Sequence, residues 1–116
     1  MAAQVIGRIA PVIASALQGK DRPDYTPQSD GGDVVVVVNA DQAIFTGKKM
    51  QDKVYYRHMG KPGNLRESSP EEKKEKFGGA ELVWQAVNGM LPKNKLRKVG
   101  LNPLTLSVVT VSCRFV

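Results

Sequence analysis

Residues 31–40 read GGDVVVVVNA and place five consecutive valines, Val34 to Val38, directly after a glycine pair and an aspartate. β-branched residues favour extended backbone, and an unbroken apolar run is typical of a strand that is buried on both faces. Such strands belong to parallel sheets with helices on either side. We therefore predict an α/β fold, a single domain with a central, mainly parallel sheet flanked by helices. A short second strand is predicted at residues 43–45.

A helix is predicted ahead of the valine run, over residues 8–18. Apolar side chains recur there at helical spacing, at Ile6, Ile9, Ala10, Ile13, Ala14 and Leu17. Because proline is tolerated best in a first turn, Pro11 predicts a helix start near Gly7 or Arg8. Gly19 is expected to end the helix, and the proline- and glycine-rich residues 20–32 form a loop.

Two further helices are predicted downstream. Ser69-Pro70 is typical of a helix start, with Ser69 as the N-cap and Glu72 completing a capping box. Gly78-Gly79 interrupts this helix, and a second helix runs from about Ala80 to Met90. Its buried stripe is expected to consist of Val83, Ala86, Val87 and Met90. Residues 53–58 alternate weakly and are expected to be extended, with an irregular loop after them.

The positive charge is concentrated in two stretches. The chain has 116 residues, a formal net charge of +6 and a pI near 9.6. Residues 47–66 carry six cationic side chains against Asp52 alone, and residues 93–98 carry four cations and no acid. Such patches are what a phosphate backbone recognises, so a polyanion is the expected ligand, with RNA as the first candidate. The alternative is a solvated surface whose lysines and arginines serve solubility.

The sequence offers little for catalysis or metal binding. His58 and Cys113 are the only histidine and the only cysteine, and they cannot fill a tetrahedral metal site. Thr46-Gly47-Lys48-Lys49 lacks the first glycine and the hydroxyl residue of a phosphate loop. No apolar run reaches the roughly 18 residues of a membrane span. We predict no enzyme, no cofactor, no small-molecule substrate and no membrane partner; a single cysteine also fits a reducing compartment.

The basic stretches combine cations with groups that can stack on bases. Tyr55, Tyr56 and His58 can stack on unpaired bases, while Lys53 and Arg57 reach phosphates between them. The alternation leaves open that one tyrosine ring faces the core. After the second helix, Pro92 is expected to direct a flexible basic arm outward. The predicted RNA-binding residues are Lys48, Lys49, Lys53, Tyr55, Tyr56, Arg57, His58, Lys61, Lys93, Lys95, Arg97 and Lys98.

At these residues the chain resembles the bacterial-type ribosomal protein L-13 family of the large subunit. The resemblance covers about residues 5–98, and its most specific parts are Lys-Val-Tyr-Tyr-Arg-His at 53–58 and Gly-Met-Leu-Pro-Lys-Asn-Lys-Leu at 89–96. The other matching pieces are Gly7-Arg8-Ile9-Ala10, Leu17-Gln18-Gly19-Lys20, Tyr25-Thr26-Pro27, Gly32-Asp33 with the valine run and Asn39-Ala40, and Thr46-Gly47-Lys48-Lys49. It implies an α/β domain and a structural, non-catalytic role on large-subunit rRNA from early in assembly. Neighbouring large-subunit proteins are the other implied partners.

Two departures from the family pattern shape the remaining expectations. The family has a strand ahead of Gly7-Arg8 that looks shortened here, and residues 99–116 read as a divergent apolar tail after a domain of residues 1–98. On these grounds we predict an organellar member in a mitochondrial ribosome, with a plastid or the bacterial cytoplasm as alternatives. The rival function is an off-ribosome regulator, a basic module that binds an mRNA element or an acidic protein.

Overall fold

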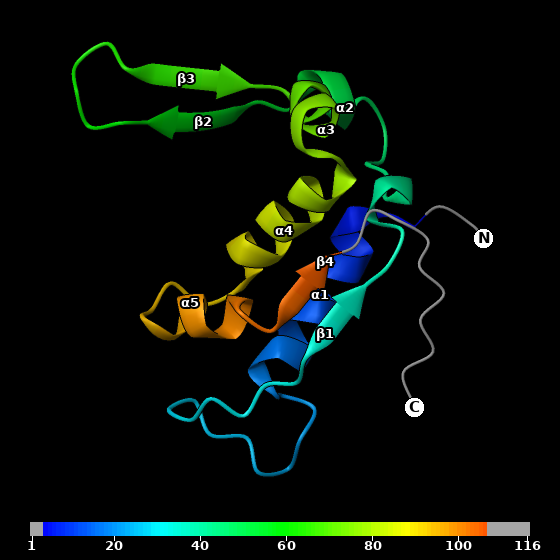
Figure 1. Ribbon diagram of the computed structural model, residues 1–116, viewed down its shortest axis with the longest axis vertical. Helices are drawn as coiled ribbons and strands as arrows, with labels where there is room; N and C mark the ends of the chain where they lie inside the picture. The colour runs from blue at the N-terminus through cyan, green and yellow to red at the C-terminus, as the bar shows by residue number, and fades with distance from the viewer. Residues whose placement is uncertain (1–3, 107–116) are drawn as a thin grey trace.

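Helices α1 (Ile6–Gln18) and α4 (Gly79–Met90) pack against each other and form the main core of the computed structural model, which describes residues 4–106 (Figure 1). Both helices are amphipathic, and burying one of their aliphatic side chains contributes about 1.5–3 kcal/mol. Among the described residues, no buried side chain is polar or charged. The core consists of Ile6, Ala10, Ile13, Ala14, Leu17, Ala40, Leu82, Val83, Val87 and Leu91. The apolar face predicted for residues 8–18 is confirmed.

The valine run forms strand β1 (Val35–Val37), which pairs in parallel with β4 (Leu104–Leu106), so that Val35 lies opposite Leu104. The predicted strand and its parallel pairing are therefore confirmed, but the partner strand comes from residues that were predicted to belong to the tail. Burial on both faces is wrong, because Val34, Val36 and Val38 are 73%, 60% and 55% exposed. Within residues 4–106 this sheet has two strands, and nothing described covers its outer face. A central, mainly parallel sheet is thus not established.

The start of α1 is set by a contact that is distant in sequence. The Ile6 amide donates to the Ile44 carbonyl at 3.0 Å, and the Ile44 amide donates to the Gln4 carbonyl at 3.1 Å. Val5 and Ile44 form a parallel bridge, which stands where a short strand at 43–45 is predicted. This pairing starts the helix at Ile6, next to the predicted start near Gly7 or Arg8. Pro11 lies beyond the first turn, so its predicted place in that turn is wrong. Gly19 ends the helix in the left-handed region, as predicted.

Helix α3 (Pro70–Phe77) begins as its sequence predicts, because Ser69 Oγ accepts a hydrogen bond from the Glu72 amide at 3.2 Å. Gly78 then separates α3 from α4. The first turn of α4 is capped from a distant segment: the Gly79 amide donates to Asp41 Oδ1 at 2.6 Å. Asp41 belongs to the short 3-10 helix η1 (Ala40–Gln42), which also packs against α4.

The buried stripe of α4 differs from the predicted one. Val83 and Val87 are buried as expected, and Leu82 is buried beside them. Met90 is 44% exposed, because the chain turns away at the end of the helix and Leu91 fills the core instead. Trp84 lies at the edge of the packed face, which agrees with its place between the stripe positions.

Two elements extend from this core on the same side of the molecule. Strands β2 (Tyr55–His58) and β3 (Leu65–Ser68) form an antiparallel hairpin at the upper left of Figure 1, preceded by the short helix α2 (Lys49–Asp52). Helix α5 (Leu96–Leu101) lies at the lower left, and α4 runs between the two. Of the residues assigned to the tail by sequence, 99–101 belong to α5 and 104–106 form β4. Residues 107–116 of the tail lie outside the described residues.

Candidate nucleic-acid interface

The hairpin presents most of the predicted site residues to solvent. Its two faces follow from the register, in which Tyr55 lies opposite Ser68, Tyr56 opposite Glu67 and Arg57 opposite Arg66. Directly opposed residues share a face, so Tyr55 and Arg57 point to one side of the hairpin and Tyr56 and His58 to the other. The exposed members of the predicted set here are Lys48, Lys49, Lys53, Tyr56, Arg57, His58 and Lys61.

The two tyrosines differ in what they touch. The Tyr55 ring is half-buried between two ammonium groups, with Lys53 Nζ at 4.9 Å and Lys73 Nζ at 4.3 Å from its centroid. Lys73 Nζ also donates to Gln85 Oε1 of α4 at 2.9 Å. Tyr55 therefore fixes the base of the hairpin to α3 and α4, whereas Tyr56 is 66% exposed and its ring is open to stacking. The alternation of residues 53–58 left open whether one tyrosine ring faces the core. The contact of the Tyr55 ring with Lys73 shows that the inward-facing ring is Tyr55.

The tip of the hairpin is shaped by a histidine and two glycines. His58 Nδ1 accepts a hydrogen bond from the Gly60 amide at 3.0 Å. Gly60 and Gly63 adopt φ angles of 82° and 78°, in the left-handed region that side chains disfavour. Lys61 lies between them and is exposed. The irregular loop predicted here is thus a defined turn that places Lys61 at the tip of the hairpin.

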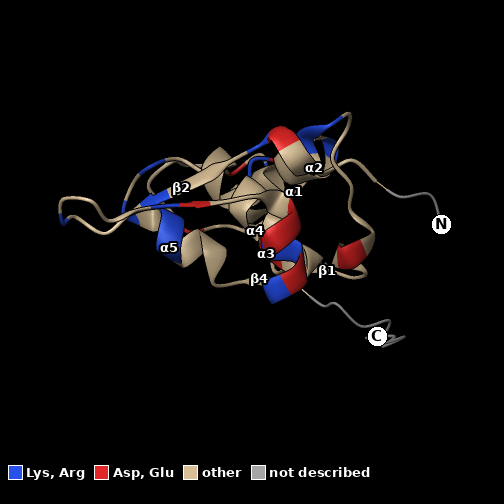
Figure 2. Cartoon of the chain, turned by 90° about the horizontal axis from the view of Figure 1, so that it is seen from above, with Lys and Arg blue, Asp and Glu red and all other residues tan. Residues whose placement is uncertain are grey.

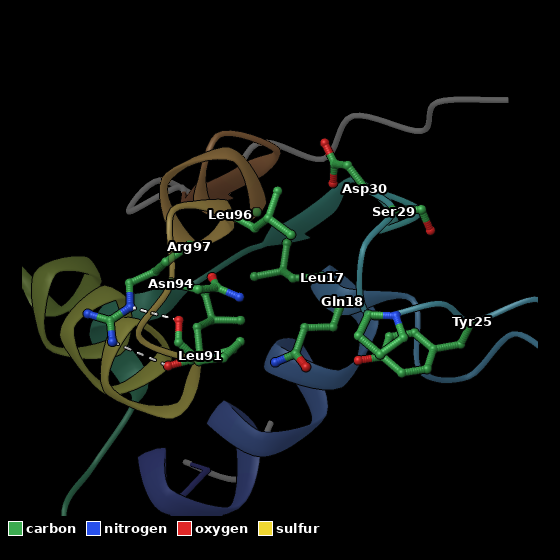
Figure 3. Close-up of a pocket in the computed structure, with 12 residues that line it drawn as sticks. Leu17, Gln18, Tyr25, Ser29, Asp30, Leu91, Asn94, Leu96 and Arg97 are labelled. Atoms are coloured by element: carbon green, nitrogen blue, oxygen red, sulfur yellow. Dashed lines mark hydrogen bonds between the residues drawn. The ribbon is translucent and has the colours of Figure 1, made fainter.

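The second basic stretch, residues 93–98, is a turn followed by the start of a helix and not a flexible arm. Residues 93–95 make a turn after α4, and α5 follows and packs against α1. Arg97 points back into the fold, where its Nε donates to the Pro92 carbonyl at 3.3 Å and its Nη2 contacts the Leu91 carbonyl at 3.5 Å (Figure 3). It thereby satisfies carbonyls just past the end of α4. The exposed cations of this segment are Lys93, Lys95 and Lys98.

A shallow pocket of about 60 Å³ lies behind this turn, between the end of α1, the loop at 20–30 and α5 (Figure 3). Leu17, Leu91 and Leu96 supply its apolar wall, and Asp30 and Arg97 are its charged lining residues. Within residues 4–106 no group of three or more potential metal ligands exists, and no helix is long and apolar enough to span a membrane. The pocket offers no arrangement of groups suited to catalysis.

Most of the exposed cations fall in two basic groups, one on α2 and the hairpin and one around α5. Lysines and arginines predominate on the hairpin and α5, whereas α3 carries three glutamates and three lysines (Figure 2). The hairpin group is Lys48, Lys49, Lys53, Arg57, Lys61 and Arg66; the α5 group is Lys93, Lys95 and Lys98. The sequence analysis missed Arg66 as a site residue, although a hairpin closed around residues 59–64 places it across from Arg57.

These features define a small protein of mixed helices and strands with two groups of exposed cations. A family model described as Ribosomal protein L13 matches residues 1–107, and the chain belongs to this family. The predicted family is therefore confirmed. Because the family is one of structural ribosomal proteins, the prediction that the chain is not an enzyme is also confirmed.

Curated relatives named "Large ribosomal subunit protein uL13" are similar to the chain. The protein of Syntrophus aciditrophicus is 48% identical over 101 residues, which is 87% of this chain and 70% of that protein. The protein of Thermotoga maritima is 50% identical over 92 residues, 79% of this chain and 61% of the relative. That of a Neisseria meningitidis serogroup B strain is 50% identical over 93 residues, 80% and 64% respectively. The chain thus spans about three fifths to two thirds of the length of most of these relatives.

Proposed function

We propose that the chain is a structural component of the large ribosomal subunit and that it binds large-subunit rRNA through the hairpin and α5. The observation that carries the proposal is the placement of the hairpin and α5 on one side of the fold, with α4 between them (Figure 1), and the exposed cations on both elements. The hairpin adds Tyr56, an exposed ring that can stack on an unpaired base. The large-subunit name of the relatives supports the same assignment.

The proposed mechanism is charge neutralisation. Lysine and arginine side chains of the hairpin and α5 displace the counterions of rRNA and hold folded segments together. With about six phosphates engaged and a slope of about −0.7 per contact, affinity falls several hundred-fold, roughly, over a fourfold rise in salt. A flat salt response contradicts this mechanism. The rigid connection through α4 suits a protein that joins two rRNA segments, and we propose that it does so from early in assembly.

The compartment is a separate part of the proposal. A mitochondrial ribosome is the predicted location, with a plastid or the bacterial cytoplasm as alternatives. The relatives named above are bacterial proteins, which makes the bacterial ribosome the alternative to test first. Immunoblotting of purified organelle and cytosol fractions from the source cells separates these locations.

Sedimentation of native extract through a sucrose gradient tests the central proposal. We expect the chain to migrate with the large subunit and to remain there after a moderate-salt wash, because many phosphate contacts act together. An off-ribosome regulator gives a different result, because it stays in the light fractions and is not detected in the fractions that contain the large subunit. Neighbouring large-subunit proteins are the other proposed partners, and crosslinking within the comigrating fraction identifies them.

A further inference from the structure

The side of the hairpin that faces α3 carries two arginines directly opposite each other. Arg57 of β2 pairs with Arg66 of β3, and both side chains project from the same face as Tyr55. Side chains in such a pair are about 4.5–5.5 Å apart at Cβ, and like charges placed there destabilise a sheet. The register therefore places two like charges opposite each other in the free protein, which disfavours the hairpin.

No carboxylate within the described part of the chain relieves this repulsion. Between residues 4 and 106, the single ion pair closer than 4.0 Å joins Arg22 to Asp33, far from the hairpin. Glu67 is the nearest acid along β3, but it lies opposite Tyr56 and projects from the other face. The two arginines are thus available to an external anion.

The arginine face forms one wall of a groove. Because Lys73 of α3 sits over the Tyr55 ring, this side of the hairpin is turned toward α3 and α4. The groove between them has a volume of about 540 Å³ and is open to solvent. Lys73 and Lys76 line its helical wall together with Glu72 and Glu81. On the hairpin wall, Glu67 lines the groove beside the arginine pair, and the helical wall is mixed. An anionic occupant is therefore held where Arg57 and Arg66 lie opposite each other.

We infer that Arg57 and Arg66 jointly bind one phosphodiester group of an RNA strand that runs along this groove. The inference rests on the proposed function for the nature of the strand. Guanidinium groups present fixed forks of donors that match phosphate oxygens, and two forks can approach one tetrahedral phosphate from different directions. A carboxylate has two coplanar oxygens that a single fork already satisfies. A phosphate between the arginines therefore fits better than an acidic protein side chain does.

The test is a double-mutant cycle measured by filter binding with large-subunit rRNA of Thermotoga maritima, the source of a 50% identical relative. Arg57→Ala and Arg66→Ala are each expected to lower affinity about ten-fold, a usual size for a lost bond to a charged group. Because both arginines hold the same phosphate, the double variant should lose little more than either single variant. The slope of log affinity against log salt concentration should become shallower by about 0.7 in the double variant, the value for one lost phosphate contact. Two lost contacts would change it by about 1.4. Additive losses, or an Arg66→Ala variant that binds normally, would overturn the inference.

The matched control is Lys20→Ala, which removes an exposed cation from the loop after α1, away from the hairpin. It is expected to leave the affinity within two-fold or so, since a distant surface charge acts through screened electrostatics alone. Arg57→Lys and Arg66→Lys keep the charge and lose the fork, so each should recover only part of the affinity. Full recovery by lysine contradicts a shared phosphate held by guanidinium geometry. Circular dichroism melting confirms that each variant is folded.

A second readout separates this inference from the proposed function. Inorganic pyrophosphate is expected to raise the melting temperature of the wild type and of Lys20→Ala, but not of Arg57→Ala or Arg66→Ala. If the wild type fails to bind rRNA but keeps this response, the phosphate site stands and the proposed function fails. If rRNA binds but pyrophosphate has no arginine-dependent effect, the site fails and the function stands. A short poly-glutamate that stabilises the protein as well as pyrophosphate shows an acidic-peptide site and also overturns the inference.

Discussion

The hairpin and α5 carry similar densities of positive charge, yet the fold uses them differently. In the hairpin, one aromatic ring is held between Lys53 and Lys73, and the cations beyond it face solvent or the groove. In α5, Arg97 turns inward to the carbonyls after α4, and the lysines around it remain exposed. Positive residues in a basic stretch are therefore not equivalent. Whether one of them serves binding or folding depends on the backbone groups and rings within its reach.

The largest effect is expected from a substitution in α4, the helix that joins the two basic groups. A Cβ at Gly79 would lie 2.7 Å from the Asp41 Cα and 2.8 Å from the Ala40 carbonyl oxygen, both backbone atoms that cannot easily move. Gly79→Ala is therefore expected to lower the free energy of unfolding by about 3 kcal/mol, from overpacking together with the loss of the Asp41 cap. Urea denaturation measures it. Gly89→Ala is the matched control, because its added methyl meets nothing within 4 Å.

Replacing the two tyrosines separates support of the hairpin from contact with RNA. Tyr55→Ala should cost about 2 kcal/mol of stability, since it removes a half-buried ring and two cation–π contacts. Tyr56→Ala should leave the unfolding midpoint nearly unchanged and weaken rRNA binding about ten-fold, the value of one lost base stack. Thermal melting and filter binding on both variants measure the two effects. Equal melting temperatures for the two variants would contradict the assigned roles.

Sequence reasoning succeeded where local chemistry decides the structure. The valine run specifies a strand through its β-branched side chains, and Gly19 ends α1 because it adopts φ 69° without steric cost. Ser69 starts α3 through a hydrogen bond three residues away. These features depend on neighbours in the sequence, so a single chain reveals them.

Sequence reasoning failed where a contact between residues distant in sequence determines the local structure. Ile44 sets the start of α1 by pairing with Gln4 and Ile6, and no local signal marks that partner. The exposure of Val36 follows from which elements cover the sheet. For the site, the exposed lysines could be predicted from charge alone. The cross-strand position of Arg66 and the inward turn of Arg97 depend on register and on where α4 ends.

Arg97 and Lys98 are adjacent in α5, so a cation that supports the fold and an exposed cation can be compared within one helix. Arg97→Ala is expected to lower the free energy of unfolding by about 1 kcal/mol, because the carbonyls of Leu91 and Pro92 lose a charged donor. Lys98→Ala, at an exposed position, should stay within about 0.5 kcal/mol of the wild type. Urea titration of the three proteins measures the difference. A stable Arg97→Ala variant with weakened rRNA binding would reverse the assignment and place Arg97 with the exposed cations.

The smallest expected effect is at Lys95, and it tests whether α5 contributes to binding at all. Lys95 is exposed in the turn before α5, and its side chain makes no hydrogen bond or ion pair within residues 4–106. Lys95→Ala should therefore leave the melting temperature unchanged and reduce rRNA affinity a few-fold, with a salt slope shallower by about 0.7. Arg57→Ala provides the comparison, because the hairpin should lose more affinity from one residue. If both variants keep the wild-type slope, the ligand engages neither basic group through its phosphates, and the exposed cations serve solubility alone.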